Sequence, residues 1–238
     1  MKRIVLIVAA LAALVNAASA APVLCASASA SYYVATYNSL ANACQVGDKL
    51  FYNFNYSGTA IGAGLIGVDG SLVNVVGDSS NPNEPGLIFS SNAWTLTSTN
   101  VDHGILDLDS SIAFTVQTID NSARITDASL DFTGAFSVSG VAGADIAERV
   151  SPNGTPPALS FHVDSTGPVS TTVFFANPVS LVTVSKDLVV IIPANAIGSA
   201  TITSFREGFS ENAPEPVGTV LIGSGLLVMG LFRRRLCK

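Results

Sequence analysis

The chain has 238 residues, of which 48% are hydrophobic and 12% are charged, and its 11 basic and 17 acidic residues give a net charge of −6. Nucleic-acid binding depends on Lys and Arg side chains that neutralise phosphate, so this balance argues against a nucleic-acid partner. The imbalance is larger within residues 21–213, where five basic residues stand against 16 acidic ones and the net charge is −11.

The chain begins with the pattern of a signal peptide. Lys2-Arg3 supply positive charge, residues 4–15 form an apolar run, and Ala18-Ser19-Ala20 provides small residues for cleavage. We therefore expect residues 1–20 to be removed and the mature chain to start at Ala21, after export through the inner membrane.

Two cysteines follow the signal peptide, and a third lies almost at the C-terminus. Cys25 and Cys44 would both be exported to a compartment where disulfides persist, whereas Cys237 would stay on the reducing side. A Cys25–Cys44 disulfide would close a loop of about 20 residues and contribute roughly 3 kcal/mol of stability. A metal pair is the alternative, but no other Cys or His lies near enough in sequence to complete a zinc set, so we predict no metal ligands and no cofactor.

Residues 21–213 have the composition of a single all-β domain, with abundant Ser, Thr, Asn, Gly and Val and many short apolar runs. Residues 33–43 predict one short helix, and the alternation in residues 49–56 predicts a strand with one aromatic-rich face. Further strands are expected at residues 71–76, 86–90, 94–99, 105–118, 124–132, 144–150, 158–163, 171–176, 179–186, 188–192 and 200–205. About a dozen short strands with this spacing predict a β-sandwich or jelly-roll.

Two histidines, His103 and His162, limit any histidine-based chemistry. Ser160, His162 and Asp164 share one face of a predicted strand, but residues two apart are separated by roughly 6.6 to 6.8 Å along it. A nucleophile and its base need direct hydrogen-bond contact, which this separation prevents unless the side chains reach toward each other. We interpret these residues as a polar strand face and His103 as a turn residue, and we predict no catalytic group among them.

Asp107 and Asp109 also share a strand face, and their spacing is compatible with the carboxylate pair of a glycosidase, about 5 to 10 Å. Three interpretations stay open: a pair that faces solvent, a pair that helps hold Ca²⁺, and a catalytic pair. The glutamates of this region fall in no recognisable motif; they are Glu84, Glu148, Glu207 and Glu211. We therefore expect a protein that is not an enzyme.

Carbohydrate binding is another function with a clear mechanism, because β-sandwiches can present aromatic side chains to sugar rings. The aromatic candidates are Tyr32, Tyr33, Tyr37, Tyr52, Tyr56 and Trp94. Such residues bury large apolar areas and usually belong to the core, so we expect Trp94 to be packed inside.

The last 25 residues have a separate pattern. Pro214-Glu215-Pro216 is followed by residues 217–232, which contain no ionisable group, and then by Arg233, Arg234 and Arg235. As a helix the apolar run would span roughly 24 Å. The hydrocarbon core is about 30 Å thick, so flanking residues and local thinning would have to supply the rest. We predict one C-terminal transmembrane helix with its basic end in the cytoplasm, the alternative being a buried core helix.

The order of Pro-Glu-Pro motif, glycine-containing apolar segment and arginine cluster resembles the PEP-CTERM sorting signal of Gram-negative bacteria, which is also labelled an ice-binding protein C-terminal domain. The resemblance covers residues 214–238. It implies that a membrane-embedded exosortase recognises Pro214, Glu215 and Pro216, cleaves nearby and passes the exported domain onward. The destination would be the cell surface or an exopolysaccharide matrix, after a temporary hold in the inner membrane.

A second similarity to PEP-CTERM proteins involves residues 44–49, the aromatic residues Phe51, Phe54 and Tyr56, and the later Lys186-Asp187. It implies kinship and no particular activity. The sequence thus predicts a signal peptide (1–20), a β-sandwich ectodomain (21–213) and a sorting signal (214–238). We expect a structural surface or matrix protein associated with exopolysaccharide or biofilm, the alternative being a carbohydrate-binding or calcium-dependent adhesive module.

Overall fold

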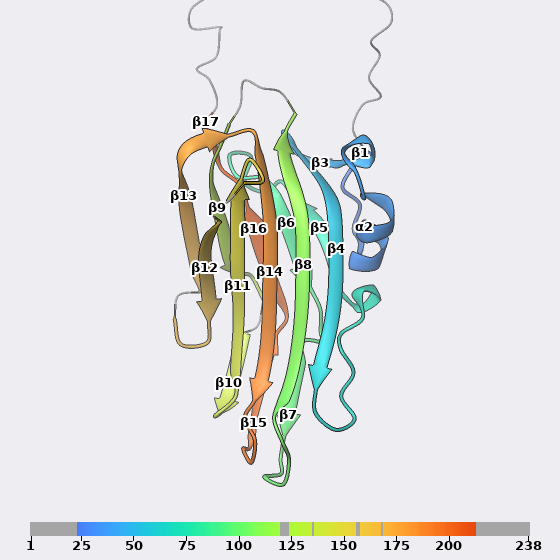
Figure 1. Cartoon of the computed structure of the whole chain (residues 1–238), viewed down its shortest axis with the longest axis vertical. Coiled ribbons are helices and arrows are strands. Elements are labelled where there is room, and N and C mark those ends of the chain that lie inside the picture. Colours follow the sequence, from blue (N-terminus) through green and yellow to red (C-terminus); the bar gives the residue numbers. More distant parts are fainter. Residues whose placement is uncertain (1–22, 120–123, 135, 156–157, 168, 213–238) are drawn as a thin grey trace, which may run out of the picture.

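A computed structural model describes residues 23–119, 124–134, 136–155, 158–167 and 169–212, which form a β-sandwich (Figure 1). The expected signal peptide (1–20) and sorting signal (214–238) lie outside the described residues. Within the described part, no helix is long and apolar enough to cross a membrane. The all-β prediction is confirmed for this part of the chain.

One layer of the sandwich, called here the long sheet, contains the longest strands. Its strands are antiparallel except for the short parallel pair β1 and β3 at one edge. In spatial order they are β1 (Val23–Leu24), β3 (Cys44–Val46), β4 (Lys49–Ile61), β8 (Leu106–Thr118), β14 (Leu181–Ile192), β11 (Gly143–Pro152) and β12 (Leu159–Asp164).

The other layer consists of two sheets. The larger, called here the broken sheet, contains β13 (Ser170–Val179), β9 (Arg124–Phe132), β16 (Ser204–Gly208), β6 (Gly86–Ser90), β5 (Asn74–Asp78) and β2 (Ala28–Ser29), with β17 (Glu211–Asn212) paired to β9. The smaller contains β10 (Phe136–Gly140), β15 (Gly198–Ile202) and β7 (Thr95–Ser98). In Figure 1 the smaller sheet lies at the end of the sandwich opposite β1 and β17.

The smaller sheet continues the broken sheet. Each of its strands adjoins a strand of the larger sheet in sequence, and the order β10-β15-β7 repeats the order β9-β16-β6. The two are joined where the ladder breaks, because Ser91 N–H donates to Thr203 O and Ile202 N–H donates to Trp94 O. The strand predicted at residues 200–205 is therefore wrong as a single element: it divides at Thr203.

A short helix, α2 (Ala30–Thr36), covers the edge of the sandwich beside β4 (Figure 1). It starts earlier than the sequence predicted because Ser29 caps it, accepting a hydrogen bond from Tyr32 N–H. It also ends earlier, and a separate 3-10 turn, η1 (Leu40–Asn42), follows. Tyr33 fixes the helix to the core by packing edge-on against Phe54, with ring centroids 4.9 Å apart.

Strand β4 changes the face that it buries partway along its length. Lys49 and Phe51 are buried before the change and Phe54 after it, so the alternation shifts by one residue. The shift occurs at a bulge between Tyr52 and Asn55, where Asn53 has a φ of 55°. A bulge adds one unpaired residue and re-aims the following side chains. The predicted aromatic-rich face therefore does not run along the whole strand.

The other predicted strands agree with the structure to different degrees. β6 and β9 have the predicted bounds, and β8, β11, β12 and β13 differ from them by a few residues. The strands predicted at residues 179–186 and 188–192 are replaced by one strand, β14 (Leu181–Ile192), while Val179 ends β13. Residues 71–76 begin as a 3-10 turn, η2 (Gly70–Leu72), because Asp69 caps Ser71 N–H, so that strand β5 starts only at Asn74.

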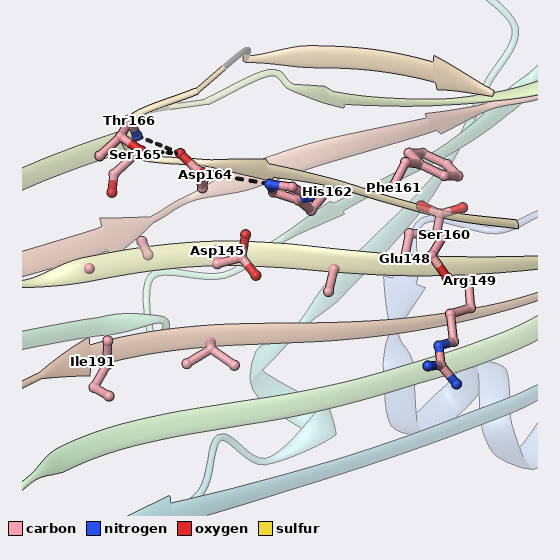
Figure 2. Close-up of a pocket in the computed structure, with 14 residues that line it drawn as sticks. Asp145, Glu148, Arg149, Ser160, Phe161, His162, Asp164, Ser165, Thr166 and Ile191 are labelled. Carbon is pink, nitrogen blue, oxygen red and sulfur yellow. Dashed lines mark hydrogen bonds and ion pairs between the residues drawn. The ribbon is translucent and has the colours of Figure 1, made fainter.

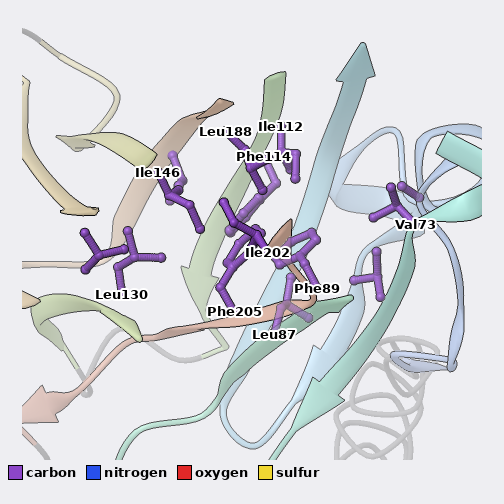
Figure 3. Close-up of a cluster of buried hydrophobic side chains, with 14 of the residues drawn as sticks. Val73, Leu87, Phe89, Ile112, Phe114, Leu130, Ile146, Leu188, Ile202 and Phe205 are labelled. Atoms are coloured by element: carbon purple, nitrogen blue, oxygen red, sulfur yellow. The ribbon is translucent and has the colours of Figure 1, made fainter. Parts of the chain in front are cut away.

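The hydrophobic core lies between the two layers and draws side chains from both (Figure 3). Phe89 of β6 stacks on Phe205 of β16 with ring centroids 5.1 Å apart, and on Phe114 of β8 at 6.0 Å. Trp94 is fully buried, as predicted, and its indole N–H donates to Ser110 Oγ over 3.1 Å. Because the inner side chains of the long sheet pack against the other layer, the alternate side chains of its strands point outward to the opposite face.

Three ionisable side chains are fully buried in this core. Lys186 of β14 donates hydrogen bonds to Glu148 Oε2 of β11 and to Glu207 Oε2 of β16, and all three side chains have zero exposure. Lys186 Nζ also lies 5.7 Å from the centre of the Phe205 ring. We call these three residues the buried triad. It connects the long sheet to the broken sheet.

The predicted disulfide is present between Cys25 and Cys44. Cys44 is fully buried, and the bond joins the start of the described chain to β3 across 19 positions of sequence. Because Cys25 precedes the helix, the disulfide closes the loop that contains α2 and η1. It thereby holds the helical edge against the sandwich.

Candidate functional site

The outer face of the long sheet carries an open hollow of about 670 Å³ between β11, β12 and β14 (Figure 2). Alternation along β11 places Asp145, Ala147 and Arg149 on this face, because Ala144, Ile146, Glu148 and Val150 face the core. Val189 and Ile191 of β14 add an apolar wall. We call this the acidic hollow.

Strand β12 supplies the polar edge of the acidic hollow. Its Ser160, His162 and Asp164 lie opposite Arg149, Ala147 and Asp145 of β11 in the antiparallel register. The turn that follows β12 holds the Asp164 side chain in place. Asp164 Oδ1 accepts hydrogen bonds from Thr166 N–H at 2.6 Å and from the Thr166 hydroxyl at 2.8 Å. His162 Nε2 lies 3.4 Å from Asp164 Oδ2, with 62% of the imidazole side chain exposed.

The two aspartates of the hollow have pKa values that are shifted in opposite directions. Hydrogen bonds from the Thr166 backbone and hydroxyl lower the pKa of Asp164, so this carboxylate stays ionised at lower pH than a free aspartate. Partial burial raises the pKa of Asp145, and the charges of Asp164 and Asp187 add to the rise against the opposing effect of His162. The hollow therefore presents one firmly ionised carboxylate and one that takes up a proton more readily.

The arrangement does not make Ser160, His162 and Asp164 a catalytic triad. His162 contacts Asp164, but no hydrogen bond joins Ser160 to His162 in the part of the chain that the structure describes. His103 is distant from the hollow in sequence and is held by its own loop, with Nδ1 2.5 Å from Gly104 O and Nε2 2.8 Å from Ala196 O. The structure thus agrees with a polar strand face.

The predicted pair Asp107 and Asp109 lies on the same outer face, one strand beyond β14. The structure adds a third carboxylate, because Asp187 of β14 lies close enough to Asp109 to shift its pKa. Partial burial, followed by the interaction with Asp187, raises the pKa of Asp109 to about 6. Burial and the Asp187 charge also raise the pKa of Asp107. We call these three residues the aspartate cluster.

The aspartate cluster and the acidic hollow form one acidic surface across four neighbouring strands. Asp109 and Asp145 both lie opposite Val189 of β14, one from each side. Among the described residues, no three His, Cys, Asp or Glu side chains are grouped closely enough to hold a metal ion. Carboxylates in such an open surface can accept hydrogen bonds from hydroxyl and ammonium groups.

The aromatic candidates do not form an exposed platform. Four of them are buried in the core, namely Tyr33, Tyr37, Tyr52 and Trp94. Tyr56 is half-buried, with its hydroxyl donating to Val68 O at 2.9 Å, and Tyr32 alone of the six is exposed. The hypothesis that these residues form a stacking platform is therefore wrong, because most of their rings pack in the core and beneath α2.

Sequence reasoning missed Asp145, Arg149 and Asp187 as parts of the outer face. Each alternates with buried residues on its strand, so period-two alternation was the available signal. Their convergence with β12 and β8 depends on the strand order β8-β14-β11-β12, which brings together segments far apart in sequence. No local motif encodes that order.

No family model matches the sequence, and no curated protein matches it significantly. Among solved structures, the chain is similar to TmCBM61 in complex with beta-1,4-galactotriose, at 17% identity and a TM-score of 0.28, over 65% of this chain and 86% of that one. It is also similar to a variant of CBM29-2, from carbohydrate-binding module family 29, at 10% identity and a TM-score of 0.21, over 63% of this chain and 93% of that one. Scores this low carry no conclusion about fold or ligand.

Proposed function

We propose that this chain is an exported, non-enzymatic protein of the cell surface or extracellular matrix, whose sandwich binds polysaccharide through the acidic surface of the long sheet. The acidic hollow carries the binding part of the proposal, because it combines an open shape with two carboxylates, of which Asp164 is fixed by hydrogen bonds, and an apolar wall. Sugar-binding sites generally pair apolar surface with a few polar groups that fix orientation.

The proposed export and processing rest on the sequence at both ends of the chain. Residues 1–20 would direct export, and Pro214, Glu215 and Pro216 with the arginines at 233–235 would direct processing by an exosortase. The Cys25–Cys44 disulfide supports an oxidising destination. The predicted transmembrane helix at 217–232 would then be a transient anchor in the inner membrane.

The charge of the surface restricts the class of polysaccharide. The surface has more acidic than basic side chains: it carries Asp145, Asp164 and the aspartate cluster, but only Arg149 and His162 as basic groups. An acidic polymer would therefore be repelled. Neutral sugars offer hydroxyl donors to the carboxylates, and amino sugars add an ammonium group, which forms stronger charge-assisted bonds. We therefore propose that the ligand is a neutral or amino-bearing polysaccharide.

Calorimetric titration of the purified protein with a neutral glucan, a partly deacetylated polyglucosamine and alginate tests the binding proposal. The expected order of affinity is polyglucosamine, then glucan, with no binding of alginate. Asp145→Asn together with Asp164→Asn should weaken polyglucosamine binding at least about tenfold, since two charge-assisted hydrogen bonds are lost. Asp102→Asn, in an exposed turn away from the hollow, is the matched control. Equal binding by the double variant would reject the hollow as the site.

Fractionation with mass spectrometry of the mature C-terminus tests the route separately. Processing predicts surface-located protein that ends near Pro216 and lacks the arginines at 233–235. Surface protein that still ends at Lys238 would contradict exosortase processing and leave a simple tail anchor. Robust hydrolysis of a polysaccharide by the purified protein, lost in Asp109→Asn, would contradict the non-enzymatic part.

A further inference from the structure

The buried triad is unusual in its composition, because it places two acids and one base where water does not reach. The three side chains lie at positions that alternation assigns to the core: Lys186 is flanked by Val184 and Leu188, and Glu207 by Phe205 and Phe209. Burying an ion costs several kcal/mol unless its partners compensate fully. One ammonium cannot neutralise two carboxylates.

The hydrogen bonds of the triad are also incomplete. Each glutamate uses Oε2 to accept from Lys186 Nζ, and Oε1 of each has no hydrogen-bond partner among the described residues. Burial, together with the charge of Glu148, raises the pKa of Glu207 well above its usual range, which favours its neutral form. The triad thus holds one amine between two carboxyl groups, of which Glu207 takes up a proton more readily than a free glutamate.

We propose that Lys186 and Glu207 become joined by an amide bond, with Glu148 acting as the proton acceptor, so that the two layers of the sandwich are covalently cross-linked. The proposal assigns a modification to the core that is independent of the acidic surface and of polysaccharide binding. It follows from three groups in direct contact: a primary amine, a carboxyl carbon and a second carboxylate.

The step balances without any co-reactant. The Lys186 ammonium transfers a proton to the Glu148 carboxylate, and the resulting amine attacks the carboxyl carbon Cδ of neutral Glu207. A C–N bond forms, the C–O bond to the Glu207 hydroxyl breaks, and that hydroxyl leaves as water after receiving a proton from the attacking nitrogen. The products are a secondary amide, one water molecule and protonated Glu148, with the same total number of protons and no change of oxidation state.

Burial favours this step in two ways. In water an amine and a carboxylic acid exchange a proton and become unreactive ions, but here burial raises the pKa of Glu207 and favours its neutral, reactive form, while Glu148 lies in place to accept the proton that Lys186 must lose. The sandwich also holds the amine against the carboxyl group, and such intramolecular contact is equivalent to effective concentrations on the order of 10⁵ M or more. The product removes two buried charges from the core and releases one water molecule.

A second lysine provides a contrast within the same chain. Lys49 Nζ is also buried and contacts Asp48 Oδ1 at 2.7 Å and Glu211 Oε2 at 2.9 Å. The side chains of Asp48 and Glu211 keep 35% and 17% exposure, whereas both glutamates of the buried triad have none. Because this second group lies at the surface and water can compete for its carboxyl groups, we expect no amide at Lys49.

Tryptic digestion of the full-length protein, denatured and reduced after purification, tests the proposal directly. The amide blocks cleavage after Lys186, so residues 150–206 stay in one piece. This piece should be joined to the peptide that begins at Glu207, with a combined mass lower by one water molecule than the sum of the two. Cleavage after Lys49 should proceed normally and serves as the internal control.

Two results would overturn the proposal. One is a free peptide of residues 150–186 as the main product from folded wild-type protein. The other is a bridge from Lys186 to the peptide of residues 125–149, which contains Glu148 and would make the wrong glutamate the acyl donor. Either is read from wild-type protein, so the test does not depend on a variant that folds.

Variants assign the roles within the triad. Glu148→Gln keeps the size of the side chain but cannot accept the proton, and general bases contribute about 10²–10⁴-fold to such steps. We expect the cross-linked fraction to form at least about 100-fold more slowly in this variant. Lys186→Arg keeps a positive charge without a nucleophilic amine and should give no cross-link, with tryptic cleavage at position 186 restored. An unchanged rate in Glu148→Gln would overturn its role as proton acceptor.

Discussion

Lys186 and Glu207 are in contact although they belong to opposite layers of the sandwich, one on β14 and the other on β16. Glu148 completes the contact from β11, the direct antiparallel neighbour of β14, where it lies opposite Lys186. Burial alone would lower the pKa of Lys186, but the two glutamate charges outweigh burial and raise it. The three side chains therefore depend on one another, and the layers can separate only if the group is broken.

Removing the base from this group should be strongly destabilising. Lys186→Met leaves Glu148 and Glu207 buried without a cation, and losing one partner of a buried ion pair typically costs about 3–5 kcal/mol. The variant also cannot form the proposed amide, so the loss of the cross-link adds to this cost. Urea denaturation should show this loss in the free energy of unfolding. Lys49→Met, whose acidic partners reach solvent, is the matched control and should lose less.

A companion variant separates charge from packing. Replacing all three members together, as Lys186→Met, Glu148→Leu and Glu207→Leu, removes the charges and fills the space with apolar atoms. Buried ion groups replaced in this way are often neutral or stabilised by about 1–4 kcal/mol. We expect the triple variant to be more stable than Lys186→Met, because it leaves no unpaired buried charge, while the contribution of the proposed cross-link stays lost. A triple variant less stable than the single one would show that packing, and not unpaired charge, causes the loss.

The disulfide should contribute to stability through the loop that it closes. Cys25 and Cys44 are separated by 19 positions, and a loop of this length is expected to lose roughly 3 kcal/mol of stabilisation when opened. Cys25→Ala with Cys44→Ala should lower the free energy of unfolding by about this amount, and reduction of the wild-type protein should do the same. Cys237→Ala is the control, because Cys237 belongs to the tail. Unchanged stability after reduction would contradict the prediction.

Strand alternation made most of the long sheet predictable, and its failures have local causes. The prediction divided β14 between Lys186 and Leu188 because a charged pair, Lys186-Asp187, interrupts an apolar run. In the structure the strand is continuous: Lys186 faces the core and Asp187 faces outward. Strict alternation along residues 181–192 would have placed Lys186 in the core. Lysine is rarely buried without a partner, so the sequence alone favoured a break in the strand at this point.

The candidate site was only partly predictable. Asp164 and His162 share a strand with Ser160, so their common face followed from sequence alone. Their encounter with Asp145 required the pairing of β11 with β12, which are joined through residues 153–158. The aspartate cluster similarly needed the order β8-β14, a pairing between strands more than 60 positions apart. Long-range pairing of this kind is set by the packing of both layers together.

The bulge in β4 gives a test of backbone conformation. Asn53 has a φ of 55°, in the left-handed region that Asn and Gly tolerate and β-branched residues do not. Asn53→Val should therefore lower stability by about 1–2 kcal/mol, whereas Asn53→Gly should be close to neutral. Thermal unfolding of both variants is the measurement, with Asn55→Val, two positions along on the same exposed surface, as the control. Equal losses at positions 53 and 55 would show that the bulge imposes no such strain.

The aspartate cluster should make stability fall as the pH rises through the acidic range. The folded protein raises the pKa of Asp109 to about 6, above the value of about 4 expected in the unfolded chain. The folded state therefore holds this proton more tightly, so its stabilising effect is present below pH 4 and is lost as the pH rises through 6.

The variant Asp109→Asn tests this pH dependence, because it removes the repulsion from Asp187 and Asp107 at neutral pH. Because the side chain is partly exposed and screened by solvent, we expect a gain of only a few tenths to about 1 kcal/mol at pH 7. Urea denaturation at pH 4 and pH 7 should show a smaller difference between the two pH values in Asp109→Asn than in the wild type. Asp102→Asn, outside the cluster, should leave the wild-type difference unchanged, and the same pH dependence in all three proteins would place the titrating group elsewhere.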